Sequence, residues 1–364
     1  MRLLVVMLLA IFSDWPIHGS QSYVYPVAID QDTVFYVYQK SLTDLELWCL
    51  FVSDNSQLQS QHLEKCLYWR FIPAGFTLLP EHKGFSFIDS GRLWVKDFIK
   101  RSPSAISFDQ PVFNISEVCW LDCKNCYFSA KQKQNFTIFI GNTSEQILKV
   151  LYDLPNVECL SPKIVANQLF CIERNQHDRD CAIVVLNFDP KLNIVDLNSK
   201  KVIADCGYQQ VIYLNMLSDK LGFYIEHMPY IHDRSWMVTL VCHKIEFINH
   251  AWKNTKLFKF NIPKKYLFGE ERLYESILPF LPRSQKTSLY FSDIKQNESG
   301  EYYSSIFSYD LIKDEILEIF TSEPGKTLFA PIICGAKLLY GTVLDRPETT
   351  LSSQFLDQHA CMLL

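Results

Sequence analysis

Three cysteines, Cys119, Cys123 and Cys126, lie close together in the stretch CWLDCKNC. Cysteine thiolates hold iron–sulfur clusters, and this C-x3-C-x2-C spacing is one that radical enzymes use. A zinc site would need a fourth ligand, usually from a second C-x2-C or a histidine pair, and none lies close in the sequence. The flanking segments VFNISEVCWL and CYFSAKQ indicate strand, turn and strand, without the helices of a βα barrel. We therefore expect neither a cluster nor zinc.

The same cysteines fit a β-hairpin whose turn contains the polar residues of DCKN. A turn centred there would place Cys119 opposite Cys126. Facing residues have Cα atoms about 4.5–5.5 Å apart, which is within reach of a disulfide. Cys171 and Cys181 flank the turn of the next hairpin, ERNQHDRD, in the same way. These four cysteines are possible disulfide partners, or else buried thiols that pack as small apolar groups.

Two further groups of residues have side chains that could bind a metal. Glu226-His227 and His232-Asp233 would lie on a hairpin interrupted by a proline, so the two histidines need not share a face. Residues 177–180, HDRD, form a charged hairpin tip that could bind calcium through oxygens, but no glycine-bearing calcium pattern is present. We expect both groups to be solvated turn residues, and we expect no metal or cofactor.

A basic run follows between residues 252 and 265, in which five lysines alternate with aromatic residues. Such a pattern can bind single-stranded nucleic acid or another polyanion. It is equally typical of an edge strand, where lysines discourage aggregation, and the net charge of −5 argues against a nucleic-acid partner. The chain also lacks a phosphate-binding loop, a dinucleotide fingerprint and a G-x-S-x-G nucleophile elbow.

Residues 1–22 have the pattern of a secretory signal peptide. Arg2 precedes the apolar run LLVVMLLAIF, and small residues offer cleavage sites after Gly19 or Ser22. This run is too short to span a hydrocarbon core of about 30 Å, and no later run is long enough. The sequence therefore predicts an exported protein, periplasmic or secreted, without a membrane span and in a compartment where cysteines can pair.

The cysteines and charged residues described above lie in a weak repeat of short strand pairs. Short aromatic strand pairs recur at seven places: 33–54, 84–98, 125–142, 168–188, 221–243, 288–310 and 337–348. Their alternation, clearest in Tyr127–Ala130 and Phe136–Ile140, predicts half-buried hairpins. Their spacing is mostly about 40–50 residues, which suits one four-stranded propeller blade.

We therefore expect residues 23–364 to form a single all-β propeller of six or seven blades. The lone strand at 23–30 would close it by pairing with 337–343, and residues 244–287 would contain an insertion. Tandem β-sandwich domains are the alternative.

The hairpin FSFI followed by LWVK, residues 85–88 and 93–96, resembles the repeats of TolB-type and other WD-like propellers of exported bacterial proteins. The resemblance covers most of the chain but rests on unspecific motifs. The Ser-Pro-Asp-Gly turn of that family survives only in part, in LSPK at 160–163 and PEHKG at 80–84. No Asn-Gly or Asp-Gly dipeptide, the strongest signal of a tight hairpin, occurs anywhere.

Propellers include both binding proteins and enzymes. We expect an exported binding or scaffold protein whose partner is another protein, bound through the rim or the central funnel. The alternative is a carbohydrate-active hydrolase or lyase that uses funnel carboxylates. An enzyme requires acids or histidines that converge with displaced pKa values, whereas a binding module requires an exposed apolar patch.

Overall fold

The structure is a computed structural model that describes part of the chain. The described residues are 23–30, 33–41, 44–52, 58–66, 77–80, 84–89, 92–97, 104–115, 118–132, 135–208, 210–227, 237–264, 280–334, 337–344 and 362–363. Side chains are described from residue 77 to residue 332, with gaps, and at Tyr340. The chain divides into two compact units, Met1–Ile72 with Asn261–Leu364, and Pro73–Phe260.

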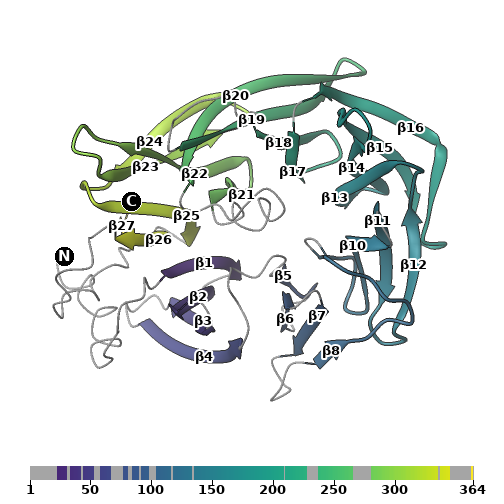
Figure 1. The fold of residues 1–364 in the computed structure, drawn as a ribbon, viewed down its shortest axis with the longest axis horizontal. Helices are drawn as coiled ribbons and strands as arrows, with labels where there is room; N and C mark the ends of the chain where they lie inside the picture. Colours follow the sequence, from purple (N-terminus) through teal and green to yellow (C-terminus); the bar gives the residue numbers. More distant parts are fainter. Residues whose placement is uncertain are drawn as a thin grey trace. The chain divides into compact units, whose positions relative to one another are not determined.

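The second unit contains four antiparallel sheets, each made of four consecutive strands (Figure 1). The first sheet consists of β5 (Thr77–Leu78), β6 (Gly84–Asp89), β7 (Arg92–Asp97) and β8 (Ser104–Ile106). The second has β9 (Cys119–Trp120), β10 (Asn125–Gln132), β11 (Asn135–Asn142) and β12 (Ile147–Tyr152). The third has β13 (Val157–Val165), β14 (Gln168–Asn175), β15 (Cys181–Asp189) and β16 (Ile194–Gly207). The fourth has β17 (Gln210–Met216), β18 (Leu221–His227), β19 (Met237–Ile248) and β20 (Ala251–Pro263).

The first unit contains one sheet of eleven strands. Its N-terminal strands are β1 (Tyr23–Asp30), β2 (Thr33–Ser41), β3 (Asp44–Val52) and β4 (Leu58–Cys66). Its C-terminal strands are β21 (Arg283–Gln285), β22 (Ser288–Gln296), β23 (Tyr302–Asp310), β24 (Glu315–Thr321), β25 (Lys326–Cys334), β26 (Lys337–Leu344) and β27 (Met362–Leu363). Two of its strand pairings rest on one register pair each. Tyr303 pairs with Lys326 between β23 and β25, and Val24 pairs with Thr342 between β1 and β26.

The all-β propeller class predicted from the sequence is confirmed, because consecutive four-stranded antiparallel meanders are the unit of that fold. The first six predicted strand pairs are antiparallel hairpins, formed by β2–β3, β6–β7, β10–β11, β14–β15, β18–β19 and β22–β23. The number of blades is not confirmed, since the strands form five hydrogen-bonded sheets rather than six or seven.

The N-terminal strand pairs with the last long strand, as predicted. β1 is hydrogen-bonded to β26 at the register pair Val24 and Thr342, and it also pairs with β2 from Tyr23 to Asp30. It therefore belongs mainly to the first meander, because the short connection to β2 makes that pairing local. In the expected insertion at 244–287, residues up to 263 form β19 and β20, while residues 265–279 lie outside the described part.

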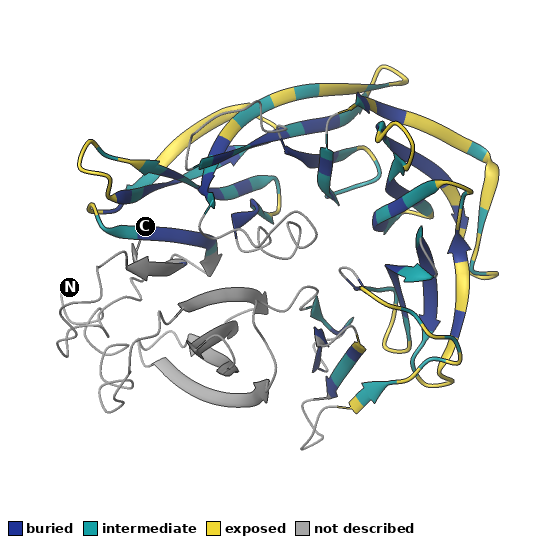
Figure 2. Ribbon diagram, viewed as in Figure 1, coloured by how far each residue is buried: buried dark blue, intermediate teal, exposed yellow. Residues whose placement is uncertain are grey.

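The hairpins are buried on both faces, not on one as predicted. In β11, Ile138 and Ile140 belong to one apolar cluster and Phe139 between them belongs to another. This alternation arises because β13 of the next sheet packs against β10 and β11, so that both faces meet apolar neighbours. Figure 2 shows that exposure is concentrated on the last strands of the sheets, such as β16 and β20.

Candidate functional site

A lysine lies among aromatic and sulfur-containing side chains where three sheets of the second unit meet. The lysine cluster consists of Cys119 on β9, Tyr127 on β10, Lys163 on β13 and Tyr213 on β17. The Lys163 Nζ is 3.7 Å from the Cys119 Sγ and 5.7 Å from the centre of the Tyr213 ring. Lys163 is buried, although Cys119 is half-buried. The ammonium group is therefore held by a thiol and a π face.

A bulge in β13 positions this lysine. The register with β14 shifts between Leu160 and Lys163, and Ser161 has a φ of 48°. The Ser161 hydroxyl donates to the Leu214 carbonyl at 3.3 Å and accepts from the Leu214 N–H at 3.2 Å. The Ser161 hydroxyl thus pairs with both the N–H and the carbonyl of Leu214 on β17. The bulge therefore connects the third sheet to the fourth and also positions Lys163.

The chemistry of the lysine cluster is that of a fixed positive charge. The Tyr127 hydroxyl accepts from the Ile164 N–H at 2.9 Å, and burial raises the pKa of Tyr127 well above its ordinary value. The tyrosine therefore stays neutral. Within the lysine cluster, the groups placed around the Lys163 Nζ are the Cys119 thiol and the Tyr213 ring.

A histidine–carboxylate pair lies elsewhere, on β18 and β19. The Nε2 of His243 is 2.8 Å from the Oε2 of Glu226, and both side chains are almost covered. The Tyr224 ring stacks on His243 with centroids 4.7 Å apart, and the Asn254 amide donates to the Tyr224 hydroxyl at 2.7 Å. Burial lowers the pKa of His243 more strongly than Glu226 raises it.

The nearest sulfur to this pair is not a nucleophile. The Tyr224 hydroxyl hydrogen-bonds to Cys206, yet burial raises the pKa of that thiol to about 12. Since the thiolate is the reactive form of cysteine, the group stays inert at neutral pH. The His243–Glu226 pair borders the apolar cluster between the third and fourth sheets.

A second carboxylate network lies between the second and third sheets. The Tyr152 hydroxyl donates to the Glu173 Oε1 at 2.5 Å, and the Lys200 Nζ donates to the Oε2 of the same carboxylate at 2.7 Å. Arg174 and Glu158 form a close ion pair nearby. Each carboxylate is held by a cation, so neither is poised as a free base.

The four cysteines proposed as disulfide partners are free thiols in this structure. The expected facing geometry is wrong in both hairpins. Cys119 faces Tyr127 and Cys126 faces Trp120, one residue out of register. Cys171 faces Val184 and Cys181 faces Arg174, and the two cysteines point to apolar clusters on opposite faces of their sheet.

The proposed metal ligands are not brought together in the described residues. Among these residues, no group of three or more His, Cys, Asp or Glu side chains is arranged to hold a metal ion. The expectation that Glu226 and His227 are solvated turn residues is wrong, because both are buried on β18. His232 and Asp233 lie outside the described part. Residues 177–180 form an exposed turn in which Asp178 accepts from the Asp180 N–H.

Residues 252–263 of the basic run lie on β20, which is the last strand of its sheet, so their interpretation as an edge strand is confirmed. Sequence reasoning missed a different surface on the neighbouring sheets. Six exposed apolar side chains, which we call the outer apolar strip, lie on β12, on β16 and in the turn before β16: Ile147, Val150, Leu192, Ile194, Leu197 and Val202. The strands β12 and β16 contact each other.

The strip is strongly exposed for apolar residues. Leu192, Leu197 and Val202 have exposed fractions of 65%, 58% and 58%. The turn that carries Leu192 is fixed, because the Asp189 carboxylate accepts from the N–H groups of residues 191 and 192. The only sequence signal for this strip was the mixed polarity of IVDLNSKKV, which lacks the strict alternation of a half-buried strand.

Known proteins resemble this chain in structure but not in sequence. No family model and no curated protein matches the sequence. An oligogalacturonate lyase from Vibrio parahaemolyticus aligns with 9% identity over 92% of this chain and 93% of its own, at a TM-score of 0.54. A puromycin hydrolase aligns with 9% identity and a TM-score of 0.57, over 91% of this chain and 51% of its own.

A putative TolB from Agrobacterium tumefaciens is also among the matches, with 7% identity over 84% of this chain and 91% of its own, at a TM-score of 0.47. At such low identities the similarity concerns the fold alone. In the described residues, no helix is long and apolar enough to cross a membrane.

Proposed function

We propose that the protein is an exported β-propeller that binds another protein, and that the outer apolar strip is its contact surface. The observation that carries this proposal is the exposure of Leu192 in the turn before β16 and of Ile194, Leu197 and Val202 on β16, the last strand of its sheet. Exposed apolar groups that gather on one surface mark interaction sites more often than chance. Charged residues between them, such as Asp196 and Lys200, supply the polar rim that interfaces show.

The described side chains support binding over catalysis. The Glu173 carboxylate is held by the Lys200 ammonium group, and the Cys206 thiol near the His243–Glu226 pair is protonated. The lysine cluster on β9, β10, β13 and β17 places the Lys163 ammonium group against a thiol and an aromatic ring. These features differ from the converging acids with displaced pKa values that a carbohydrate-active hydrolase or lyase would need.

The binding proposal can be tested by site-specific photo-crosslinking in the native host. We would place a photoreactive residue at Leu197 or, as a control, at Lys253, an exposed position on β20. We expect a discrete cross-linked protein from Leu197 that disappears when Ile194 and Val202 are replaced by aspartate. Equal labelling at Leu197 and Lys253 would contradict the proposal, as would measurable cleavage of oligogalacturonate by the purified protein.

The export proposal rests on residues 1–22, which lie outside the described part. We would express the full chain in a Gram-negative host, fractionate the cells and sequence the mature N-terminus. We expect periplasmic protein that begins at Ser20 or Tyr23, since small residues precede both positions. Cytoplasmic protein that retains Met1 would refute export without bearing on the apolar strip.

A further inference from the structure

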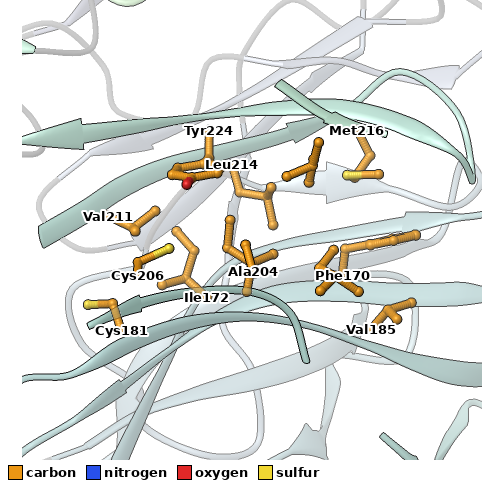
Figure 3. Close-up of a cluster of buried hydrophobic side chains, with 13 residues drawn as sticks. Phe170, Ile172, Cys181, Val185, Ala204, Cys206, Val211, Leu214, Met216 and Tyr224 are labelled. Carbon is orange, nitrogen blue, oxygen red and sulfur yellow. The ribbon is translucent and has the colours of Figure 1, made fainter. Parts of the chain in front are cut away.

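Two cysteines other than the pairs expected from the sequence lie beside each other at one end of the third sheet. Cys181 begins β15, and Cys206 is the residue before the end of β16. The register pairs Cys181 with Gly207 and Ala182 with Asp205, so Cys206 is an additional residue in a bulge. Both cysteine side chains are buried in the same apolar cluster, as Figure 3 shows.

The bulge brings the two side chains to one face. Neighbouring residues of a regular strand point to opposite faces, but a bulge breaks this alternation. Gly207, which faces Cys181 directly, has no side chain, and a Cβ placed on it would meet no atom within 4 Å. Cys206, the neighbour of Gly207 in the chain, is therefore the closest residue of β16 whose side chain enters the same apolar cluster as Cys181.

The register places Cys181 opposite Gly207, the residue bonded directly to Cys206. Facing residues of antiparallel strands have Cα atoms about 4.5–5.5 Å apart, and disulfides join Cα atoms about 4.4–6.8 Å apart. Cys206 is bonded directly to the residue that faces Cys181 and shares its cluster. Cys171 fails this test, since it faces Val184 and its side chain points to the opposite face.

We propose that Cys181 and Cys206 form a disulfide that joins β15 to β16 when the protein folds in an oxidising compartment. Its presence in the cell rests on the proposed export, but its formation in vitro does not. The bond would fix the C-terminal end of β16, the strand that carries three of the six residues of the outer apolar strip. The modification would thereby stiffen the surface that we assign to the partner.

The reaction is thiol–disulfide exchange with a small disulfide such as oxidised glutathione. The sulfur of one cysteine attacks the glutathione disulfide, forms a mixed disulfide and releases one glutathione thiol. The sulfur of the other cysteine then attacks the mixed disulfide and releases the second glutathione. The two protein thiols are oxidised, the glutathione disulfide is reduced, and the two protons end on the released glutathione thiols.

The thiol–disulfide exchange should take place before folding buries Cys181 and Cys206 in the apolar cluster. Burial raises the pKa of both thiols in the folded protein, that of Cys206 to about 12. Because exchange needs a thiolate, the folded and reduced protein should react slowly. The experiment therefore oxidises the chain during refolding.

We would refold the full chain from urea in a mixture of reduced and oxidised glutathione, alkylate the remaining thiols and map the linked peptides. We expect a peptide pair that joins Cys181 to Cys206, with Cys171 alkylated. Alkylation of both Cys181 and Cys206, or linkage of either to another cysteine, would overturn the proposal.

A stability measurement provides a second test with matched variants. Cys242 is an equally buried free thiol, but it lies on β19 in another sheet. We expect a reductant to lower the urea midpoint of the oxidised wild type and of Cys242→Ser. In Cys206→Ser, the reductant should no longer lower the urea midpoint through this bond. An equal effect of reductant in wild type and Cys206→Ser would refute the bond, whatever the outcome of the export experiment.

Discussion

Phe170 is the residue at which the packing of two neighbouring sheets can best be measured. It lies on β14 with an exposed fraction of 0%, and its ring meets that of Trp252 on β20 edge-on, with centroids 5.9 Å apart. Figure 3 shows it in the apolar cluster that the third and fourth sheets share. Phe170→Ala removes this ring and leaves a cavity that rigid sheets cannot close.

We expect Phe170→Ala to lower the free energy of unfolding by about 3–5 kcal/mol, the range observed for buried aromatic truncations. The edge-to-face contact accounts for about 0.5–1.5 kcal/mol of this loss. That part should appear as the coupling energy in a double-mutant cycle with Trp252→Ala. Leu197→Ala, at an exposed position of the same unit, should change stability by less than about 0.5 kcal/mol.

The assay is urea denaturation of the four proteins of the cycle and of the Leu197 control, followed by tryptophan fluorescence and circular dichroism. Both probes should give one transition for the unit, because the midpoint has a simple meaning only then. A loss below about 1 kcal/mol for Phe170→Ala would refute the close packing of the sheets. Coupling indistinguishable from zero would refute the ring contact.

Burial lowers the pKa of His243 beside Glu226, so the unfolded chain binds the proton more readily than the native state. The stability that this site contributes should be fully present above the ordinary histidine pKa of about 6.5, and it should fall as the pH drops towards the lowered pKa. His243→Gln should reduce this acid dependence in thermal melts. Greater stability of the wild type at low pH would contradict the assignment. Gly84→Ala should destabilise strongly in urea, since a Cβ there would lie 2.0 Å from the Lys96 carbonyl oxygen. Gly207→Ala meets no atom but has a φ of 55°, so it should cost only about 1–2 kcal/mol; equal losses for the two glycine variants would show that the clash argument is wrong.

The hairpins could be predicted because their determinants are local. Aromatic and β-branched residues in alternation favour strands, and polar turn residues between them set the pairing of neighbours. The pairings of β10 with β11 and of β14 with β15 follow from sequence that is contiguous. The burial of both faces could not be read in the same way, because it depends on which sheet lies next to which.

The facing positions expected for the cysteines were wrong for a related reason. A shift of one residue moves a side chain to the other face of a sheet, and turn residues alone do not set the register to that accuracy. Cys119 therefore faces Tyr127 and not Cys126. The proximity of Cys181 to Cys206 depends on a bulge in a strand that begins after a separate turn, and no spacing rule marks it.

By itself, the amino-acid sequence determined that this protein is built from aromatic β-hairpins, because strand propensity and alternation act over a few residues. Only the tertiary structure decided which charges were neutralised, which cysteines lay together and which apolar residues remained outside. The residues next to Lys163, Glu226 and Leu197 in the sequence do not indicate their surroundings. Lys163 lies over the Tyr213 ring, Glu226 is paired with His243, and Leu197 is exposed. Contacts between residues distant in the chain fix those differences, since the energy of a charge or an apolar group depends on what surrounds it.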